Sequence, residues 1–450
     1  MTLKTCSPSV LAACLLTLPL AASDEFLVRA PGAYVQQIAN RFGMAVLQQV
    51  PGQEVFRVRG PQGVPADQVM AWVRNYDFGD NDTDDDDDDD VLIEQNIVVT
   101  LPEVGVGNLI GSTRPASDAA ANRASTNFFG DIVRTSYARQ PMMRHVRVPE
   151  THAAMATGAG VVAVIDTGID PLHPALTRWV RPGYDFIRNQ AGLPSELADL
   201  DASTLALLNP YTTAIVDSVA TLNPYTTAIV DQNTAAGLNP NQLPAGFGHG
   251  TMVAGVVRLI APRAFIMPLK SFGADGRGTL FNVVRAIYYA QANGARVINM
   301  SLSFETPSPE LEKAVVYVSE RGVTCVGSAG NRGLETLTYP AAYQQVIGVG
   351  STTMLDQRSI FSNFGDNLVR IGAPGEGIIT PYPGGKYAAA WGTSFSAPIV
   401  SGAVALMLHV KPQLGWEWAD AAVSEAEPAI GNLGSGRLNV YRAVDKARQF

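Results

Sequence analysis

Three residues that together can act as a nucleophile, a base and an orienting acid occur in glycine-rich motifs far apart in the sequence. Asp166 ends the apolar run 161–165, His249 stands between two glycines before a helical run, and Ser394 opens a later helical run. A hydroxyl, an imidazole and a carboxylate can form a hydrogen-bonded relay in which the imidazole takes the hydroxyl proton. The order Asp, His, Ser along the chain is one of the orders found in such triads.

Each of these residues also has a structural interpretation when it is taken alone. Asp166 can form a turn before a glycine, His249 can be a structural histidine, and Ser394 can be a helix N-cap. The three structural interpretations fail together, because each residue stands at the end of an expected strand or helix in a glycine-rich context. We therefore expect the three side chains to meet at the carboxyl edge of a parallel sheet, where open α/β sheets bind ligands.

A fourth polar residue, Asn331, follows the strand-like run 323–326 through four small residues. Its amide can donate a hydrogen bond to an oxyanion, and a turn asparagine is the alternative. The helix that begins at Ser394 would add free N–H groups and positive potential. Both features favour the negative oxygen that forms when a serine attacks a carbonyl.

The elements that would position these residues lie between about residue 137 and the C-terminus, where apolar strand-like runs alternate with helical runs. We expect strands at 161–165, 264–268, 297–300, 323–326 and 346–349, and helices at 250–259, 280–293, 309–320 and 394–410. Continuous apolar strands that alternate with helices are typical of an α/β fold with a mostly parallel sheet flanked by helices.

Residues 24–101 predict a separate small α+β domain. Their pattern is strand, helix, strand, strand, helix, strand, which suggests a ferredoxin-like fold. Residues 77–90 insert an aspartate-rich run before the last strand. Charge repulsion favours a solvated loop there, and calcium binding is an alternative that lacks the spacing of an EF-hand loop.

Two further segments interrupt the pattern of strands and helices. Residues 102–136 are rich in Gly, Ala, Ser, Asn and Pro, which is typical of a linker. The ten residues LNPYTTAIVD occur twice, at 208–217 and 222–231. We interpret them as a duplication in a surface loop, with a binding element as the alternative.

The N-terminus has the features of an export signal at residues 1–23. Lys4 precedes an apolar run, and small residues stand at a cleavage site before Asp24. The run is too short to span a membrane, and we expect no span later in the chain. A lipoprotein cleavage box ending at Cys14 is the alternative. Either way Cys325 is the one cysteine left in the domain, so no intramolecular disulfide is expected, and we interpret it as a buried, inert thiol.

The composition excludes some classes of protein. Of the 450 residues, 46% are hydrophobic and 16% are charged, which excludes a largely disordered chain. The net charge of −9 comes from the aspartate run at 77–90, and the rest of the chain is close to neutral. The lack of net basicity counts against a dedicated nucleic-acid binder.

Four sequence blocks resemble the signature blocks of subtilisin-like serine peptidases. They are Val-Ile-Asp166-Thr-Gly, Gly-His249-Gly-Thr-x-Val-Ala-Gly, Ser-Ala-Gly-Asn331 and Gly-Thr-Ser394-x-Ser-Ala-Pro. The resemblance covers residues 137–450 and implies a subtilisin-like catalytic domain. The first unit resembles the inhibitory propeptides of the same family. The resemblance thus implies a secreted endopeptidase made as a self-processing zymogen.

The resemblance also implies roles for individual residues. Ser394 would attack a peptide carbonyl, His249 would take its proton, and Asp166 would orient the imidazole. The Asn331 amide would stabilise the oxyanion, and the pocket for the residue before the scissile bond would be bordered by Ser301, Leu302 and Ser303. Substrates would be proteins or peptides. The chemistry would need no cofactor, although a structural calcium ion is compatible with the family.

The sequence departs from the family pattern at three places. The 83 positions from Asp166 to His249 are a long interval, Ser303 stands where glycine is common, and Ile399 stands where histidine is common. None of these changes removes a catalytic group. The alternative function is a catalytically silent binding protein with the same fold, which would have no physical need to keep all four polar residues.

Overall fold

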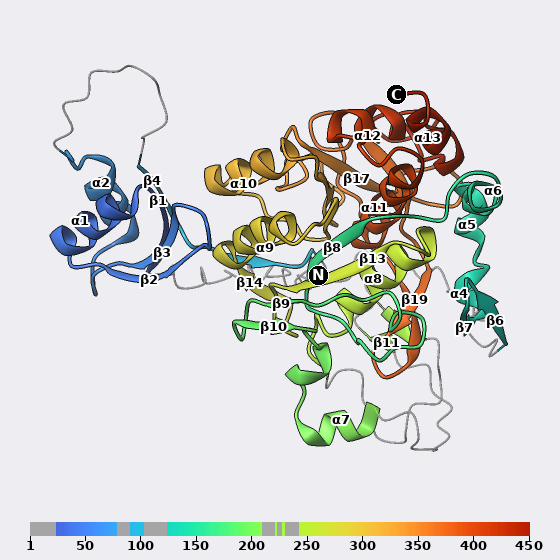
Figure 1. The fold of residues 1–450 in the computed structure, drawn as a ribbon, viewed down its shortest axis with the longest axis horizontal. Helices are drawn as coiled ribbons and strands as arrows, with labels where there is room; N and C mark the ends of the chain where they lie inside the picture. Colours follow the sequence, from blue (N-terminus) through green and yellow to red (C-terminus); the bar gives the residue numbers. More distant parts are fainter. Residues whose placement is uncertain (1–23, 79–90, 103–123, 209–220, 223–226, 230–242) are drawn as a thin grey trace, which may run out of the picture. The chain divides into compact units, whose positions relative to one another are not determined.

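The chain forms two compact units, one ending at Ile97 and one spanning Val98–Phe450 (Figure 1). The structure is a computed structural model that describes residues 24–78, 91–102, 124–208, 221–222, 227–229 and 243–450. The predicted leader, most of the aspartate-rich insertion and most of the predicted linker lie outside these residues. Of the duplicated segment, Leu208 from the first copy and residues 222 and 227–229 from the second are described.

The first unit has the expected order of elements. They are β1 (Glu25–Arg29), α1 (Gly32–Phe42), β2 (Ala45–Gln49), β3 (Val55–Arg59), α2 (Ala66–Arg74) and β4 (Leu92–Gln95). The antiparallel sheet has the order β2-β3-β1-β4, which is the ferredoxin-like arrangement. Alternate sheet residues such as Phe26, Val28 and Val58 pack against Val35 and Ile38 of α1.

The last strand expected for the first unit, 91–101, is divided in the structure. β4 completes the first sheet, whereas β5 (Val98–Thr100) pairs with β14 (Arg277–Thr279) inside the second unit. The first unit therefore ends four residues before the boundary we expected at 101. Apolar alternation alone identifies a strand but not the sheet it joins, because the pairing partner is decided by tertiary contacts.

The second unit contains the predicted parallel sheet, with the order β10-β9-β13-β8-β15-β16-β17-β18. Each neighbouring pair is parallel except β10 with β9 at one edge. The strands are β8 (Val161–Asp166), β9 (Gly183–Asp185), β10 (Gln190–Gly192), β13 (Phe265–Lys270), β15 (Val297–Met300), β16 (Thr324–Ser328), β17 (Val346–Thr352) and β18 (Ile371–Pro374). All six residues of β8 are buried, as expected for a strand covered on both faces.

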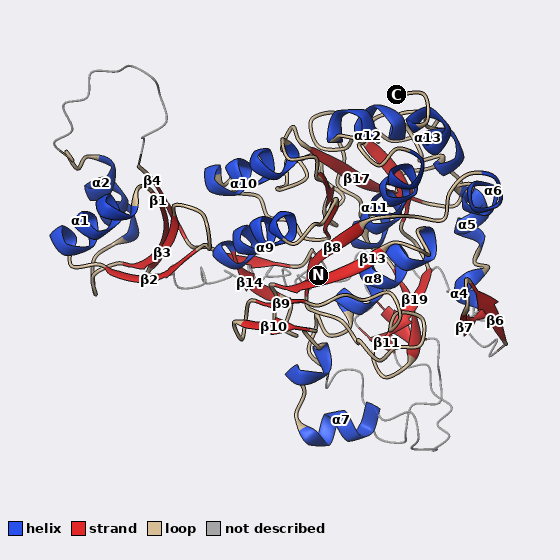
Figure 2. Ribbon diagram, in the orientation of Figure 1, coloured by secondary structure: helices blue, strands red, loops and turns tan. Residues whose placement is uncertain are grey.

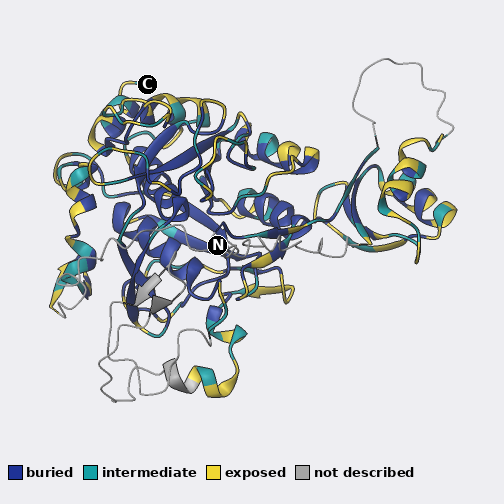
Figure 3. Cartoon of the chain, turned by 180° about the vertical axis from the view of Figure 1, so that it is seen from behind, coloured by how far each residue is buried: buried dark blue, intermediate teal, exposed yellow. Residues whose placement is uncertain are grey.

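Helices cover both faces of this sheet (Figure 2). α8 (His249–Ile260) and α11 (Thr393–Val410) pack against each other on one face, together with α12 (Trp416–Val423) and α13 (Val440–Ala447). α9 (Leu280–Ala292) and α10 (Pro309–Ser319) pack against each other outside that core. Apart from the exposed edge strand β10, the sheet is largely buried, and so are the helices α8 and α11 (Figure 3). The α/β fold with a mostly parallel sheet is therefore confirmed.

Short elements complete the second unit. β11 (Thr221–Leu222), β12 (Thr227–Ile229), β20 (Lys386–Ala390) and β19 (Ile378–Tyr382) form a small antiparallel sheet. The remaining helices are α4 (Thr135–Ala138), α5 (Pro141–His145), α6 (Val148–Ala154), α7 (Ala202–Leu208) and the 3₁₀ helix η1 (Glu196–Asp199). β12, whose residues belong to the second copy of the duplicated segment, thus pairs with β20.

The end of the predicted linker is structured, contrary to our expectation. It forms the hairpin of β6 (Ser125–Phe128) and β7 (Asp131–Arg134). Asp131 accepts hydrogen bonds from buried Arg258 at 2.7 Å and from Trp179 at 2.8 Å. Arg258 and Trp179 lie 127 and 48 positions away in the sequence, so the local composition could not reveal that the hairpin is anchored to the second unit.

One described helix, α11, is long and apolar enough to cross a membrane by length and composition alone, which we did not expect of any segment after the leader. Of its apolar window, 89% is buried inside the second unit. This burial is typical of the central helix of a protein core.

Candidate active site

Asp166 and His249 are in direct contact at the carboxyl edge of the sheet. Asp166 is the last residue of β8, and His249 is the first residue of α8. Nδ1 of His249 lies 2.8 Å from Oδ1 and 2.9 Å from Oδ2 of Asp166, and both side chains are buried. The Thr167 backbone N–H also donates to Asp166 Oδ1 at 2.7 Å. A carboxylate in this position fixes the tautomer of the imidazole and favours its charged form.

Two glycines allow β8 and α8 to approach this closely. A Cβ at Gly250 would lie 2.1 Å from the carbonyl oxygen of Gly168, which excludes a side chain there. Gly248, just before the helix, has a φ of 88°, in the left-handed region that glycine adopts without strain. The motif Gly-His249-Gly is therefore required by geometry on both sides of the histidine.

Ser394 lies in the first turn of α11, next to the same histidine. The His249 ring lies against the ring of Phe395, with 5.6 Å between the centroids. Ser394 is fully buried, and its hydroxyl makes no hydrogen bond within the described part of the chain. Because a helix N-terminus carries exposed N–H groups and positive potential, the position suits a serine that attacks a carbonyl.

Asn331 is held beside Ser394 by the residue that precedes the serine. Its Oδ1 accepts hydrogen bonds from the backbone N–H and the hydroxyl of Thr393, both at 2.9 Å. The Thr393 hydroxyl oxygen in turn accepts from the Gly330 N–H at 3.1 Å. Because Thr393 uses the amide oxygen, the amide nitrogen is the group of Asn331 that can act as a donor. The sequence reasoning did not identify Thr393, although it stands inside the motif of Ser394.

The structure also brings the predicted substrate-binding residues to this site. The Ser301 hydroxyl donates to the carbonyl of Ser394 at 2.8 Å, and Ser328 Oγ donates to the carbonyl of Leu302 at 3.4 Å. Ser303 lies beside the loop of Asn331, because a Cβ at Gly330 would lie 3.1 Å from Ser303 Oγ. All seven residues singled out from the sequence thus lie at one edge of the sheet.

An extended segment is bound near this edge. β5 pairs antiparallel with β14, and the Leu101 N–H donates to the carbonyl of Gly276 at 3.0 Å. Val99 and Leu101 are buried, each with 1% of its surface exposed. β14 is connected to the sheet edge that carries Asp166. The N–H of Phe272, which forms a bridge with Gly278 of β14, donates to the carbonyl of Asp166 at 3.2 Å. The second unit therefore contains a built site for an extended strand.

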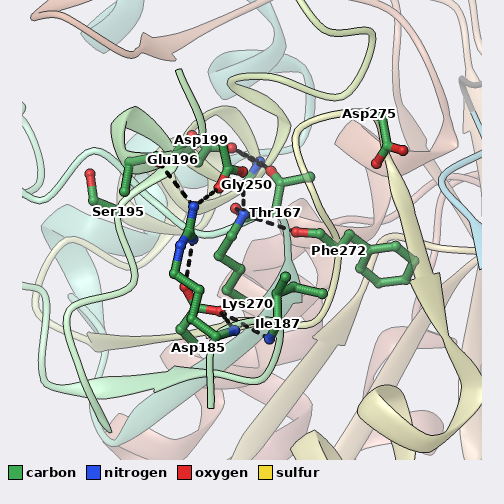
Figure 4. Close-up of polar contacts among 12 residues, drawn as sticks. Thr167, Asp185, Ile187, Ser195, Glu196, Asp199, Gly250, Lys270, Phe272 and Asp275 are labelled. Atoms are coloured by element: carbon green, nitrogen blue, oxygen red, sulfur yellow. Dashed lines mark hydrogen bonds and ion pairs between the residues drawn. The ribbon is translucent and has the colours of Figure 1, made fainter. Parts of the chain in front are cut away.

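Charged residues behind Asp166 form a network that the sequence reasoning missed (Figure 4). The fully buried ammonium of Lys270 donates to the carbonyl oxygens of Thr167 at 2.6 Å and Phe272 at 2.9 Å, and to Asp199 at 2.6 Å. Asp199 also binds Arg188 at 2.5 Å. A lysine at the end of an apolar strand was the available signal, because a buried ammonium needs a carboxylate and carbonyl partners.

The described residues hold no group of three or more His, Cys, Asp or Glu side chains arranged to bind a metal ion. Cys325 is buried in β16, and burial raises the pKa of its thiol to about 12. A thiol with this pKa is almost entirely protonated at neutral pH and is a poor nucleophile. This environment agrees with our interpretation of an inert cysteine.

Comparison with known proteins places this geometry in a family. A model of the subtilase family matches residues 158–434, which include every candidate site residue. The chain is similar to subtilisin BL of Lederbergia lenta, with 33% identity over 316 residues that cover 66% of this chain and 96% of that protein. It is also similar to an alkaline protease of Alkalihalobacillus alcalophilus (32% identity, 66% and 68% covered) and to thermitase of Thermoactinomyces vulgaris (30%, 64% and 90%).

We predict that Cys325 does not react with thiol reagents in the folded protein at pH 7 to 8. The thiolate is the reactive form, and a pKa of about 12 leaves almost none of it. The protein without its leader should take up one equivalent of a chromogenic disulfide reagent only after unfolding in guanidinium. Stoichiometric reaction before unfolding would contradict the prediction.

Proposed function

The chain belongs to the subtilase family and is a subtilisin-like serine peptidase, and on this premise we propose that it is a secreted endopeptidase with the triad Asp166, His249 and Ser394, made as a self-processing zymogen. One observation carries the assignment of the triad. Ser394 lies between Thr393, which holds Asn331, and Phe395, which lies against the imidazole bound to Asp166.

In the proposed reaction, Ser394 attacks the carbonyl carbon of a peptide bond while His249 takes the hydroxyl proton. The imidazolium that forms is stabilised by the Asp166 carboxylate at 2.8 Å. His249 then gives the proton to the leaving amine, which leaves an acyl-enzyme. Water enters, the histidine takes its proton, and the acyl group is released as an acid. The chemistry uses side chains and backbone groups alone, so we propose that it needs no cofactor.

The negative oxygen of the tetrahedral intermediate would be bound by two donors. One is the amide nitrogen of Asn331, whose side chain is held beside Ser394 by the contacts of its oxygen with Thr393. The other is the backbone N–H of Ser394 in the first turn of α11. Donors that are already oriented cost no reorganisation during the reaction, which is why such sites accelerate acyl transfer strongly.

The substrates of this site would be extended peptide segments of proteins. β14 already holds an extended segment, 98–101, through backbone hydrogen bonds. Pairing of this kind recognises the peptide backbone and leaves specificity to the side-chain pockets. The segment directly follows the first unit in the chain, which supports a propeptide whose end occupies the strand-binding site until it is cut.

The proposed place of action is outside the cytoplasm, because residues 1–23 have the pattern of an export signal. Anchoring through a lipid at Cys14 is the alternative. A structural calcium ion is compatible with the family resemblance.

We predict that a fluorescent fluorophosphonate labels the purified protein at Ser394. Ser394→Ala should abolish labelling and lower the rate of peptide hydrolysis by about 10⁶-fold, the loss found when the nucleophile of a subtilisin is removed. Ser424→Ala, at an exposed serine, should label like the wild type. Absence of labelling in the wild type, with hydrolysis equal to that of Ser394→Ala, would favour the catalytically silent binding protein.

We predict that maturation depends on the chain's own serine. In a host that lacks other extracellular proteases, the wild type should be shortened to a product whose N-terminal sequence begins between Leu101 and Tyr137. Ser394→Ala should accumulate with the first unit still attached, because the nucleophile that cuts the segment is missing. Processing of the variant at the same bond and rate would exclude self-cleavage.

We predict that Asn331→Leu lowers kcat by about 10²–10³-fold and changes KM little, as found for the same donor in a subtilisin. The donor acts on the oxyanion and so matters mainly in the transition state. Steady-state kinetics with a peptide anilide measure both constants. Asn293→Leu, at an exposed asparagine on the far end of α9, is the control and should keep both constants. A rise in KM with unchanged kcat would assign Asn331 to substrate binding.

A further inference from the structure

A second buried carboxylate, Glu196, lies behind the catalytic pair and has no part in the mechanism above. It is the first residue of η1, and 1% of its surface is exposed. Its Oε1 accepts from the Thr167 hydroxyl and, at 3.1 Å, from the Gly250 N–H, which also donates to the Thr167 hydroxyl oxygen at 2.9 Å. Its Oε2 accepts from the hydroxyl of Thr251 and from the Thr251 N–H at 3.3 Å.

These donors stand in a particular relation to the catalytic residues. Thr167 follows Asp166 in the chain, and Gly250 and Thr251 follow His249. One carboxylate therefore connects the strand end that carries the catalytic acid with the helix start that carries the base. It also takes the place of an N-cap for α8, since Gly248 has no side chain that could accept from the first N–H groups of the helix.

The hydroxyl protons further define what Glu196 does. Thr167 has one hydroxyl proton and two acceptors within reach, Glu196 and, at 3.2 Å, Oδ1 of Asp166. Glu196 is the nearer acceptor and takes this proton. Oδ1 of Asp166 then keeps its accepting capacity for the imidazole N–H of His249. The Thr251 hydroxyl oxygen accepts from the Asp170 N–H at 2.7 Å, so its own proton is directed to Glu196.

The charged and titratable groups around Glu196 come from four elements. Asp166 of β8 and Lys270 of β13 act on it electrostatically, Tyr382 of β19 lies within electrostatic reach, and His249 begins α8. Burial, and to a smaller extent the nearby Asp166, raise the pKa of the Glu196 carboxyl above its usual value, although the hydrogen bonds from the two threonine hydroxyls and the charge of Lys270 oppose this shift. A carboxylate that accepts at both oxygens is expected to have such partners: two hydroxyls, the Thr251 N–H, and the Gly250 N–H, which it shares with the Thr167 hydroxyl oxygen.

We propose that Glu196 is a positioning residue for the Asp166–His249 pair, which it ties together through Thr167, Gly250 and Thr251, and that its negative charge stabilises the imidazolium form of His249. The proposal rests on the triad proposed above. Glu196 does not touch the reacting atoms, so it acts through the two residues that it holds.

The test compares the pH dependence of kcat/KM between the Glu196→Gln variant and the wild type. Each protein is expressed as the full chain and measured after maturation. Removing a negative charge lowers the pKa of a nearby imidazole, so the midpoint of the acidic limb should move to lower pH by about half to one unit. The imidazolium of the transition state is stabilised less, so kcat at the plateau should fall about three- to tenfold, with KM nearly unchanged.

Glu310→Gln is the matched control. Glu310 has the same exposed fraction of 1% and also lies in the first turn of a helix, but α10 carries no catalytic residue. It should leave the midpoint and kcat as in the wild type. Each rate is divided by the concentration of active sites that a fluorophosphonate labels. A wild type that takes up no label would therefore refute the proposed function, whereas the inference on Glu196 is judged only on labelled enzyme.

An unshifted midpoint in a labelled Glu196→Gln enzyme would overturn the proposal, since it would mean that no charge is lost at Glu196. If this variant does not fold, Thr251→Val carries the test. Thr251→Val removes one hydrogen-bond donor to Glu196, so a smaller fraction of the carboxylate is ionised in the pH range of the acidic limb. The midpoint of that limb should therefore also move to lower pH, by a smaller amount than in Glu196→Gln. Thr251→Ser keeps the hydroxyl and should restore the wild-type midpoint. Equal midpoints in Thr251→Val and the wild type would overturn the proposal.

Discussion

A carboxylate held entirely out of water needs hydrogen-bond donors, and the buried Asp166 makes this requirement the central constraint of the second unit. Its donors are Nδ1 of His249 and the N–H of Thr167. Burial without such partners would cost several kcal/mol and would favour the protonated acid. The end of β8 and the start of α8 must therefore meet to within the length of one hydrogen bond.

Close packing of backbones meets this constraint. Gly250 lets α8 begin against the carbonyl of Gly168, and Gly402 lets α11 lie against Ile260 of α8, where a Cβ would be 2.5 Å away. The first contact fixes the start of α8 against the end of β8, and the second fixes the middle of α11 against the end of α8. The buried sheet and the apolar helix α11 thus serve to hold a few polar atoms at the edge where the strand end of β8 and the starts of α8 and α11 meet.

The polar residues behind the site show how the fold keeps buried charges satisfied. Lys270 is paired in register with Asp166 across β13 and β8, and its ammonium reaches Asp199 and two carbonyl oxygens. Asp199 connects further to Arg188 near the edge of the sheet. Residues 185–199 lie in the long interval between Asp166 and His249. Ion pairs that are partly or fully buried link this segment to the sheet edge that carries Asp166.

The sequence by itself determined the parallel α/β sheet, the order of the elements in the first unit and the set of polar residues that meet at one edge. These features follow from local rules, since apolar periodicity identifies strands and helices, and glycine-flanked motifs mark where backbones approach closely. Tertiary structure alone decided that residues 98–100 pair with β14, that the hairpin 125–134 is anchored by Asp131, and that Glu196 and Lys270 lie behind Asp166. Each of these contacts joins residues far apart in the chain, and only folding brings their backbones and charges within hydrogen-bond distance.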